Sequence, residues 1–96
     1  MSHTFHPHAE KELAEIEKYY DSQGEAISNR FRADLELAIT RILRFPHSSQ
    51  PLTRSIRRRR LNAFPNGVIY RLRTDEIRIL AVTHLRREPW YWLGRT

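Results

Sequence analysis

The stretch Ile77-Arg78-Ile79-Leu80-Ala81-Val82-Thr83-His84 decides the fold that we expect for this chain of 96 residues. It contains the longest uninterrupted apolar run, residues 79–82. Successive side chains of a strand point to opposite faces of its sheet, which puts Ile77, Ile79 and Ala81 on one face and Leu80 and Val82 on the other. Because both faces are apolar, we predict a strand in the interior of a sheet, covered on at least part of both sides.

Further strands are expected before this stretch. Residues 68–73 alternate, and Thr74-Asp75-Glu76 supplies a turn after them. Residues 61–64 are predicted to form a weaker strand, and the arginine run 57–60 leads into it. Pro65-Asn66-Gly67 is a turn signal. Thr4-Phe5 is a candidate short strand. The alternation puts two sets of side chains on opposite faces: Val68, Tyr70 and Leu72 on one, Ile69, Arg71 and Arg73 on the other.

Two helical patterns precede the strands. Pro7 suits the first turn of a helix, and Gly24 is a natural C-terminal cap for it. The first helix carries apolar residues at helical spacing (Ala9, Leu13, Ile16 and Tyr20) and glutamates that are expected to face water (Glu10, Glu12, Glu15 and Glu17). The second ends before Pro46 and carries Ile27, Phe31, Leu35, Ala38, Ile39 and Ile42.

The short connection between these helices makes them pack antiparallel. We therefore predict an α+β fold: an N-terminal antiparallel helical hairpin on one face of a three- to four-stranded, mainly antiparallel sheet. Residues 88–95, with Trp90, Tyr91 and Trp92, are expected to cover part of the other face.

Length and composition set the limits of this fold. The 96 residues fit one domain, 1–96. The chain has no cysteine, which excludes disulfides and thiolate sites and suits a reducing compartment. No segment approaches the roughly 20 apolar residues of a membrane span, and residues 1–8 lack the apolar region of a signal peptide. We expect a cytoplasmic protein that contacts no membrane.

Charge is distributed unevenly along the chain. Residues 1–40 hold four basic and eight acidic residues, a net charge of −4. Residues 41–96 hold 13 arginines, no lysine and three acidic residues, a net charge of +10. Arginine offers a planar fork of donors and stacks on rings. Such a segment is expected to meet a polyanion or an acidic protein segment.

The run Arg57-Arg58-Arg59-Arg60 is one candidate anion site. Side chains alternate along a strand, so only two of the four can share a face. The site would use either Arg58 and Arg60 or Arg57 and Arg59. The alternative is a solvated sheet edge that its charge protects from aggregation.

The densest cluster of candidate residues is His84-Leu85-Arg86-Arg87-Glu88-Pro89-Trp90-Tyr91-Trp92. Histidine exchanges protons near neutral pH, the two arginines suit phosphate or carboxylate, and the rings offer stacking surfaces. The alternative is a structural cap, in which Trp and Tyr close the core and Arg86 or Arg87 pairs with Glu88 or an acidic helix residue.

The sequence lacks several signatures of catalysis. It has no glycine-rich phosphate loop, no nucleophile elbow and no acidic metal cluster, and His6 and His8 make a poor metal site. We expect no metal and no cofactor. Any cleavage of RNA would be metal-independent, with arginines stabilising charge on the phosphate and His84 or Tyr91 moving protons.

Over nearly its whole length the chain resembles the RelE/ParE superfamily, the toxins of type II toxin–antitoxin modules. The order and spacing of seven segments carry the resemblance: Phe5-x-Pro7-x-Ala9-x-x-Glu12-Leu13, Tyr19-Tyr20, Arg30-Phe31, Phe45-Pro46, Arg59-Arg60-Leu61-x-x-Phe64-Pro65, Ile69-Tyr70-Arg71, and Ile79-Leu80-Ala81-Val82-x-His84-x-Arg86-Arg87-x-Pro89-x-Tyr91-Trp92. It implies the same helical hairpin on an antiparallel sheet.

The resemblance also implies a function. ParE-like toxins poison DNA gyrase, whereas RelE-like toxins cut mRNA in the ribosomal A site. RelE-like toxins carry an arginine three positions before the strand tyrosine, where this chain has Gly67 before Tyr70. The closing Arg-Arg-x-Pro-x-Tyr-Trp is closer to ParE-like plasmid-stabilisation proteins. We therefore predict a ParE-like gyrase poison, with a RelE-like ribonuclease as the alternative. The third possibility is a non-toxic member of the family that serves only as a binding partner of an antitoxin.

Site residues and partners follow from the resemblance and from the charge. A ribonuclease would use Arg58, Arg60, His84, Arg86, Arg87 and Tyr91. A surface that binds the target or antitoxin would use Arg57, Arg58, Arg59, Arg60, Arg71, Arg73, Arg86, Arg87, Tyr91 and Trp92. The expected partner is a cognate acidic antitoxin whose C-terminal segment orders on binding. The expected assembly is a toxin–antitoxin hetero-oligomer.

Overall fold

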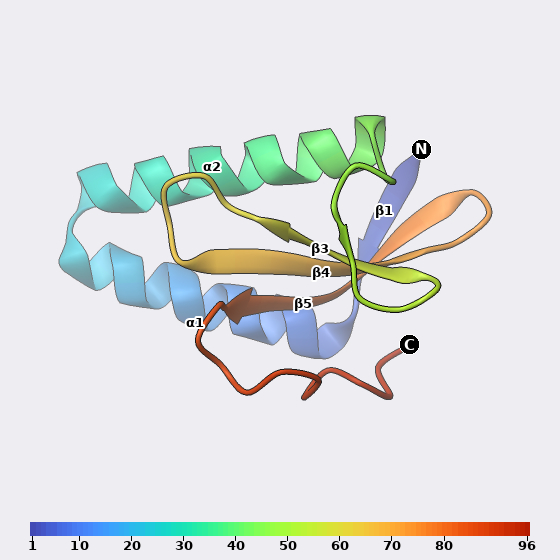
Figure 1. The fold of residues 1–96 in the computed structure, drawn as a ribbon. Helices are drawn as coiled ribbons and strands as arrows, with labels where there is room; N and C mark the ends of the chain where they lie inside the picture. Colours follow the sequence, from blue (N-terminus) through green and yellow to red (C-terminus); the bar gives the residue numbers. More distant parts are fainter.

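The computed structural model describes all 96 residues as two helices packed on a five-stranded sheet (Figure 1). The sheet order is β1-β5-β4-β3-β2, and every neighbouring pair is antiparallel except β1 and β5, which are parallel. This confirms the predicted α+β fold. The elements are β1 (Ser2–Phe5), α1 (Pro7–Gln23), α2 (Glu25–Arg44), β2 (Gln50–Pro51), β3 (Ile56–Arg60), β4 (Asn66–Leu72) and β5 (Glu76–His84).

The sheet has more strands than the three or four predicted, and β3 lies earlier than predicted. β2 is a two-residue edge strand between α2 and the arginine run, where the sequence predicts no strand. Its proline is tolerated because an edge leaves one side unpaired. Residues 61–64 form no strand. The carboxylate of Asp34 in α2 accepts the backbone N–H groups of Asn62 and Ala63 at 3.1 and 2.8 Å. These N–H groups bond to a helix side chain, and the strand consists of the arginine run instead.

The helical hairpin has a single connecting residue. Gly24 has φ +130°, a conformation that L side chains rarely adopt, and it ends α1 and begins α2. Arg32 of α2 binds back to α1, with Nε 3.1 Å from Glu17 and Nη2 3.0 Å from Asp21. No helix of the structure is both long enough and apolar enough to cross a membrane.

A β-bulge corrects the predicted alternation of β5. Ile69 of β4 pairs with Ala81, and the next residue of β4, Tyr70, pairs with Ile79, so Leu80 is an extra residue on β5. Leu80 and Ala81 consequently belong to the same face of the sheet, and Val82 belongs to the face that packs on the helices. The sequence carries no signal for this extra residue.

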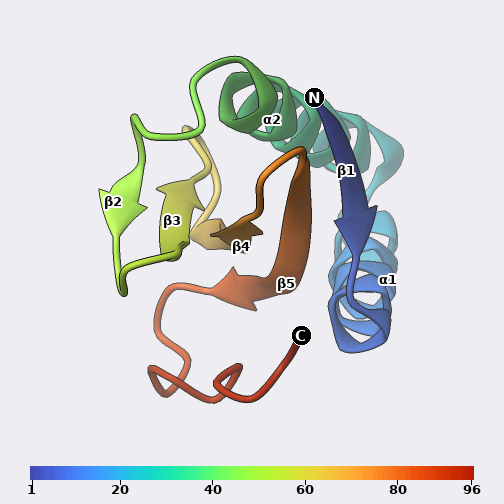
Figure 2. The same cartoon turned by 90° about the vertical axis from the view of Figure 1, so that its right-hand side faces the viewer.

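Both faces of β5 are covered, as predicted. The face toward the helices packs into a core of 12 buried residues that includes Phe31, Ile42 and Tyr70. On the opposite face, which we call the far face, Trp92 packs against Leu80 and is 4% exposed. Figure 2 shows the segment after β5 on the opposite side of that strand from α2.

The start of α1 is sensitive to pH. His6 is the N-cap, and its Nδ1 accepts the backbone N–H of His8 at 3.0 Å. Burial and the neighbouring His8 lower the pKa of His6 below its ordinary value of 6.5. Nδ1 accepts this bond only when the imidazole is neutral, so the cap is present above pH 6.5 and is lost as pH falls through the lowered pKa.

We therefore expect His6→Asn to reduce the loss of thermal stability between about pH 7 and pH 5, because asparagine is an N-cap acceptor that does not titrate. Melting temperatures of both proteins across this range measure the effect. The other four histidines, His3, His8, His47 and His84, are the same in both proteins, so the difference between the curves isolates His6. Parallel curves would contradict the assignment of His6 as a titrating cap.

Candidate functional site

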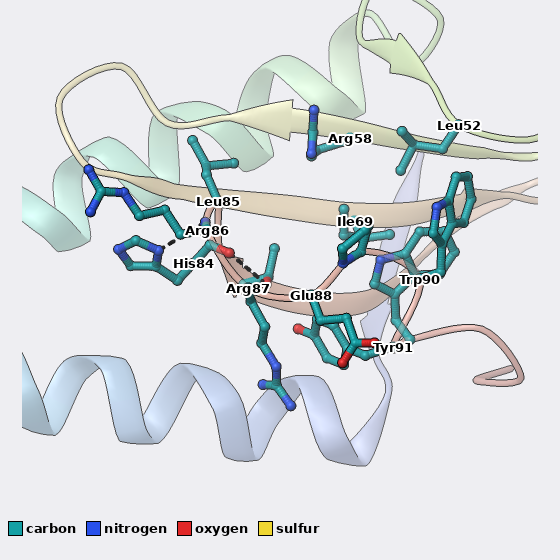
Figure 3. Close-up of a pocket in the computed structure, with 13 residues that line it drawn as sticks. Leu52, Arg58, Ile69, His84, Leu85, Arg86, Arg87, Glu88, Trp90 and Tyr91 are labelled. Atoms are coloured by element: carbon teal, nitrogen blue, oxygen red, sulfur yellow. Dashed lines mark hydrogen bonds between the residues drawn. The ribbon is translucent and has the colours of Figure 1, made fainter.

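The far-face pocket lies where β5 leaves the sheet and has a volume of about 390 Å³. Figure 3 places Leu52 and Trp90 at one end, His84 and Arg86 at the other, and Arg58 between them. Its walls come from the loop after β2, strands β3, β4 and β5, and the segment after β5. It is lined by Leu52, Arg58, Ile69 and residues 83–92.

Arg58 is the cation inside this pocket. It is half-buried, its Nη2 donates to Gln50 Oε1 at 2.7 Å, and its Nε is buried without a hydrogen-bond partner. Burial, followed by the charge of Arg60, lowers the pKa of Arg58 below its ordinary value. Arginine remains charged at neutral pH even so. The pocket therefore holds a positive charge with unused donor capacity beside the apolar side chain of Ile69.

The alternation of β3 sends Arg57 and Arg59 to the opposite face. Arg57 donates to the carbonyls of His47 and Ser49 at 2.9 and 2.8 Å. Arg59 donates to the hydroxyl of Ser49 at 3.3 Å. Tyr70, on the same face, donates to the carbonyl of Pro46 at 2.7 Å. These side chains hold the loop after α2 against the sheet. Arg57 and Arg59 therefore contact this loop, whereas Arg58 and Arg60 belong to the far face.

Arg71 and Arg73 lie outside the pocket. Arg71 donates to Ser55 Oγ at 3.0 Å, and Arg73 donates to the carbonyl of Thr96 at 2.8 Å and lies 3.9 Å from Glu76. Of the predicted binding residues, the structure brings together Arg58, Arg86, Arg87, Tyr91 and Trp92. Arg60 is exposed near them, at the end of β3.

His84 and Arg86 form the end of the pocket away from Trp90. His84 Nδ1 accepts the backbone N–H of Arg86 at 3.1 Å, so the other ring nitrogen is left for other partners. Arg86 is exposed and makes no ion pair within 4 Å. Gly67 lies beneath this end: a Cβ there would stand 3.1 Å from Leu85 and 3.5 Å from the side chain of Arg58. Glycine at this position therefore leaves room for the side chain of Leu85.

Arg87 points the other way, toward α1 (Figure 3). Its guanidinium lies 3.7 Å from the centre of the Tyr91 ring and its Nη1 lies 3.4 Å from Glu12 Oε2. This is the predicted pairing of Arg87 with an acidic helix residue. Arg87 thus links the segment after β5 to the first helix.

Glu12 does not face water, contrary to prediction. It is 9% exposed, and its Oε1 accepts the backbone N–H of Val82 at 3.1 Å and Nη1 of Arg95 at 3.0 Å. Arg95 also donates to the carbonyl of Leu80 at 2.9 Å. One buried carboxylate therefore joins α1, β5 and the C-terminal segment. Glu12 follows Ala9 by three residues and precedes Ile16 by four, a spacing that puts it within the apolar stripe.

Tyr91 is poorly placed to act as a base. Its hydroxyl is buried and has no hydrogen-bond partner. Burial raises the pKa of Tyr91 above its ordinary 10.0, so the hydroxyl is protonated and unable to act as a base near neutral pH. No group of three or more His, Asp or Glu side chains is arranged to hold a metal. The geometry is that of a cationic binding pocket.

Comparison with known proteins identifies the family to which the chain belongs. Its fold resembles a solved structure described as the chromosomal ParDE TA system from P. aeruginosa, with a TM-score of 0.73 and 18% identity over 88% of this chain and 95% of that chain. Residues 4–89 match the family described as the ParE toxin of type II toxin–antitoxin systems, parDE. The chain belongs to this family, which confirms the predicted ParE-like toxin. A search of curated proteins found no match.

We predict that Glu12→Gln lowers the free energy of unfolding by about 2–4 kcal/mol, because the amide leaves Arg95 without its buried counter-charge. Urea unfolding measures the change. The matched control is Glu15→Gln, an exposed position on the same helix. Equal stability of the two variants would show that Glu12 does not join these elements.

Proposed function

We propose that this protein is the toxin of a two-protein module, that it inhibits growth by poisoning DNA gyrase in the cytoplasm, and that a cognate antitoxin neutralises it. Membership of the ParE toxin family supports the proposal. The observation that carries it is the far-face pocket itself. Arg58 and Arg86 have no acidic partner there, and the Tyr91 hydroxyl is buried, an arrangement that favours binding over catalysis.

A RelE-like, metal-independent ribonuclease is the second candidate. The observation in its favour is that Arg58, His84 and Arg86 line one pocket, with one ring nitrogen of His84 available. Two features weigh against it. Gly67 occupies the position at which the resemblance to RelE-like toxins calls for an arginine, and the Tyr91 hydroxyl is withdrawn from solvent. Losing one charge-stabilising donor typically slows such a reaction by about 10²–10³-fold.

Purified toxin is expected to inhibit DNA supercoiling by purified gyrase and to accumulate cleaved complexes. Arg86→Ala should weaken this inhibition by about tenfold or more, because it removes an exposed cation that no intramolecular contact engages. Arg41→Ala, an exposed arginine on α2, is the control. Wild-type protein that leaves gyrase unaffected, while new mRNA 5′ ends appear in the ribosomal A site, would replace this function with the ribonuclease.

An acidic antitoxin segment is expected to bind more weakly as salt rises, because its carboxylates would meet arginine side chains that solvent ions can screen. Affinity measured by calorimetry between about 50 and 500 mM NaCl tests this. A control titration with a neutral solute at matched osmolality separates screening from general solvent effects. An affinity that does not change with salt would contradict electrostatic recognition by this face.

A further inference from the structure

We propose that the far-face pocket is a receptor for a single Asp or Glu side chain of an extended peptide, with Arg58 as its primary donor. The assignment of that peptide to the antitoxin rests on the proposed function. What makes Arg58 the anchor is its position together with its environment: it lines the pocket, its side chain is half-buried, and its Nε is enclosed without a partner. Arg71 also has a buried Nε without a partner, but it lies outside the pocket. A guanidinium in this state gains more from a carboxylate than one in open water does.

The geometry around Arg58 fits a side chain that is acidic at its tip and next to apolar residues. Arg86 offers a second cation at one end of the pocket, and Leu52 and Trp90 offer an apolar end (Figure 3). Trp90 is 44% exposed, although large apolar side chains are usually withdrawn from solvent. An acidic residue flanked by an aliphatic one would bind the cations and the apolar end of the pocket at the same time.

The backbone at Trp90 points to a binding role as well. Trp90 is the only non-glycine residue of the chain with positive φ, at 72°. Bulky side chains rarely adopt this conformation, and such strain concentrates at ligand-binding positions. The indole lies beside that of Trp92, tilted by 45° with 5.3 Å between centroids, and Trp92 packs in the far-face core. The apolar end of the pocket is therefore connected to the core of this face.

The distribution of unused arginines favours a peptide over a nucleic acid. A nucleic-acid surface neutralises a row of phosphates. Here Arg57 and Arg59 hold a loop on the opposite face, Arg71 and Arg73 bind main-chain or hydroxyl oxygens, and Arg87 binds Glu12. The far face has Arg58, Arg60 and Arg86 left, and Glu88 lies among the lining residues. This set suits one or two carboxylates beside an apolar surface.

Capped peptides of alternating leucine and serine with one central glutamate, and the same peptides with glutamine, test the proposal on the full chain at low salt. Two signals report binding: the Nε–H resonance of Arg58 and the tryptophan fluorescence, to which Trp90 and Trp92 both contribute. We expect the glutamate peptide to shift the Nε–H resonance, quench the fluorescence and bind at least roughly tenfold more tightly than the glutamine peptide. Equal binding of the two peptides, or no binding, would overturn the proposal without any variant.

Substitutions then locate the site. Arg58→Gln should abolish the preference for glutamate. Arg58→Lys should retain part of it, because the positive charge remains without the planar fork of guanidinium donors. The control is Arg54→Gln, at an exposed arginine outside the pocket, which should leave the preference unchanged. An unchanged preference in Arg58→Lys and Arg58→Gln would overturn the assignment of Arg58. A single-stranded oligonucleotide that shifts the Arg58 resonance at lower concentration than the peptide would replace the peptide with a nucleic acid.

The gyrase assay keeps this proposal separate from the proposed function. Protein that binds the glutamate peptide but leaves gyrase unaffected would refute gyrase poisoning and leave the receptor intact. Protein that inhibits gyrase but does not distinguish glutamate from glutamine would refute the receptor and leave the toxin function intact.

Discussion

The rest of the structure depends on the contacts that the buried carboxylate of Glu12 makes. It is buried between α1 and β5, and its oxygens are satisfied by the Val82 N–H and by Arg95, with Arg87 at the rim. A buried charge is tolerated only when it is paired and hydrogen-bonded, so these contacts stabilise the folded chain. Because Arg87 and Arg95 belong to the C-terminal segment, the same contact brings that segment back to the sheet, where it forms a wall of the far-face pocket.

The position of each arginine along β3 determines its role. Neighbouring side chains of one strand point to opposite faces, so Arg57 and Arg59 stabilise a loop while Arg58 enters the pocket. The strong positive charge of residues 41–96 is therefore not one continuous binding surface. Much of it is used internally. Arg58, Arg60 and Arg86 are left for a partner at the far face, whereas the exposed Arg41, Arg44 and Arg54 lie outside the pocket.

Much of the fold could be predicted from periodicity and from individual residues. Pro7 marks the start of α1 and Gly24 its end, and the apolar residues of α2 recur at regular helical spacing. The apolar residues at successive positions of β5 indicate that this strand is covered on both sides. The bulge at Leu80 could not be predicted, because one additional residue reverses the alternation without altering composition. The sequence predicts β3 too late in the chain because its arginines resemble an exposed segment more than a strand. It predicts an exposed Glu12 because the buried partners of this residue, Val82 and Arg95, lie far away in sequence.

The central claim is that the C-terminal segment folds back over the far face of the sheet and thereby forms the pocket. The solvent accessibility of Trp92 tests it most directly, since this residue is 4% exposed and packs on the core of that face. In a protein carrying Trp90→Phe, Trp92 is the one remaining tryptophan. The account predicts blue-shifted emission that acrylamide quenches poorly in the native state and strongly in urea. Native emission and quenching equal to those of the unfolded chain would contradict it.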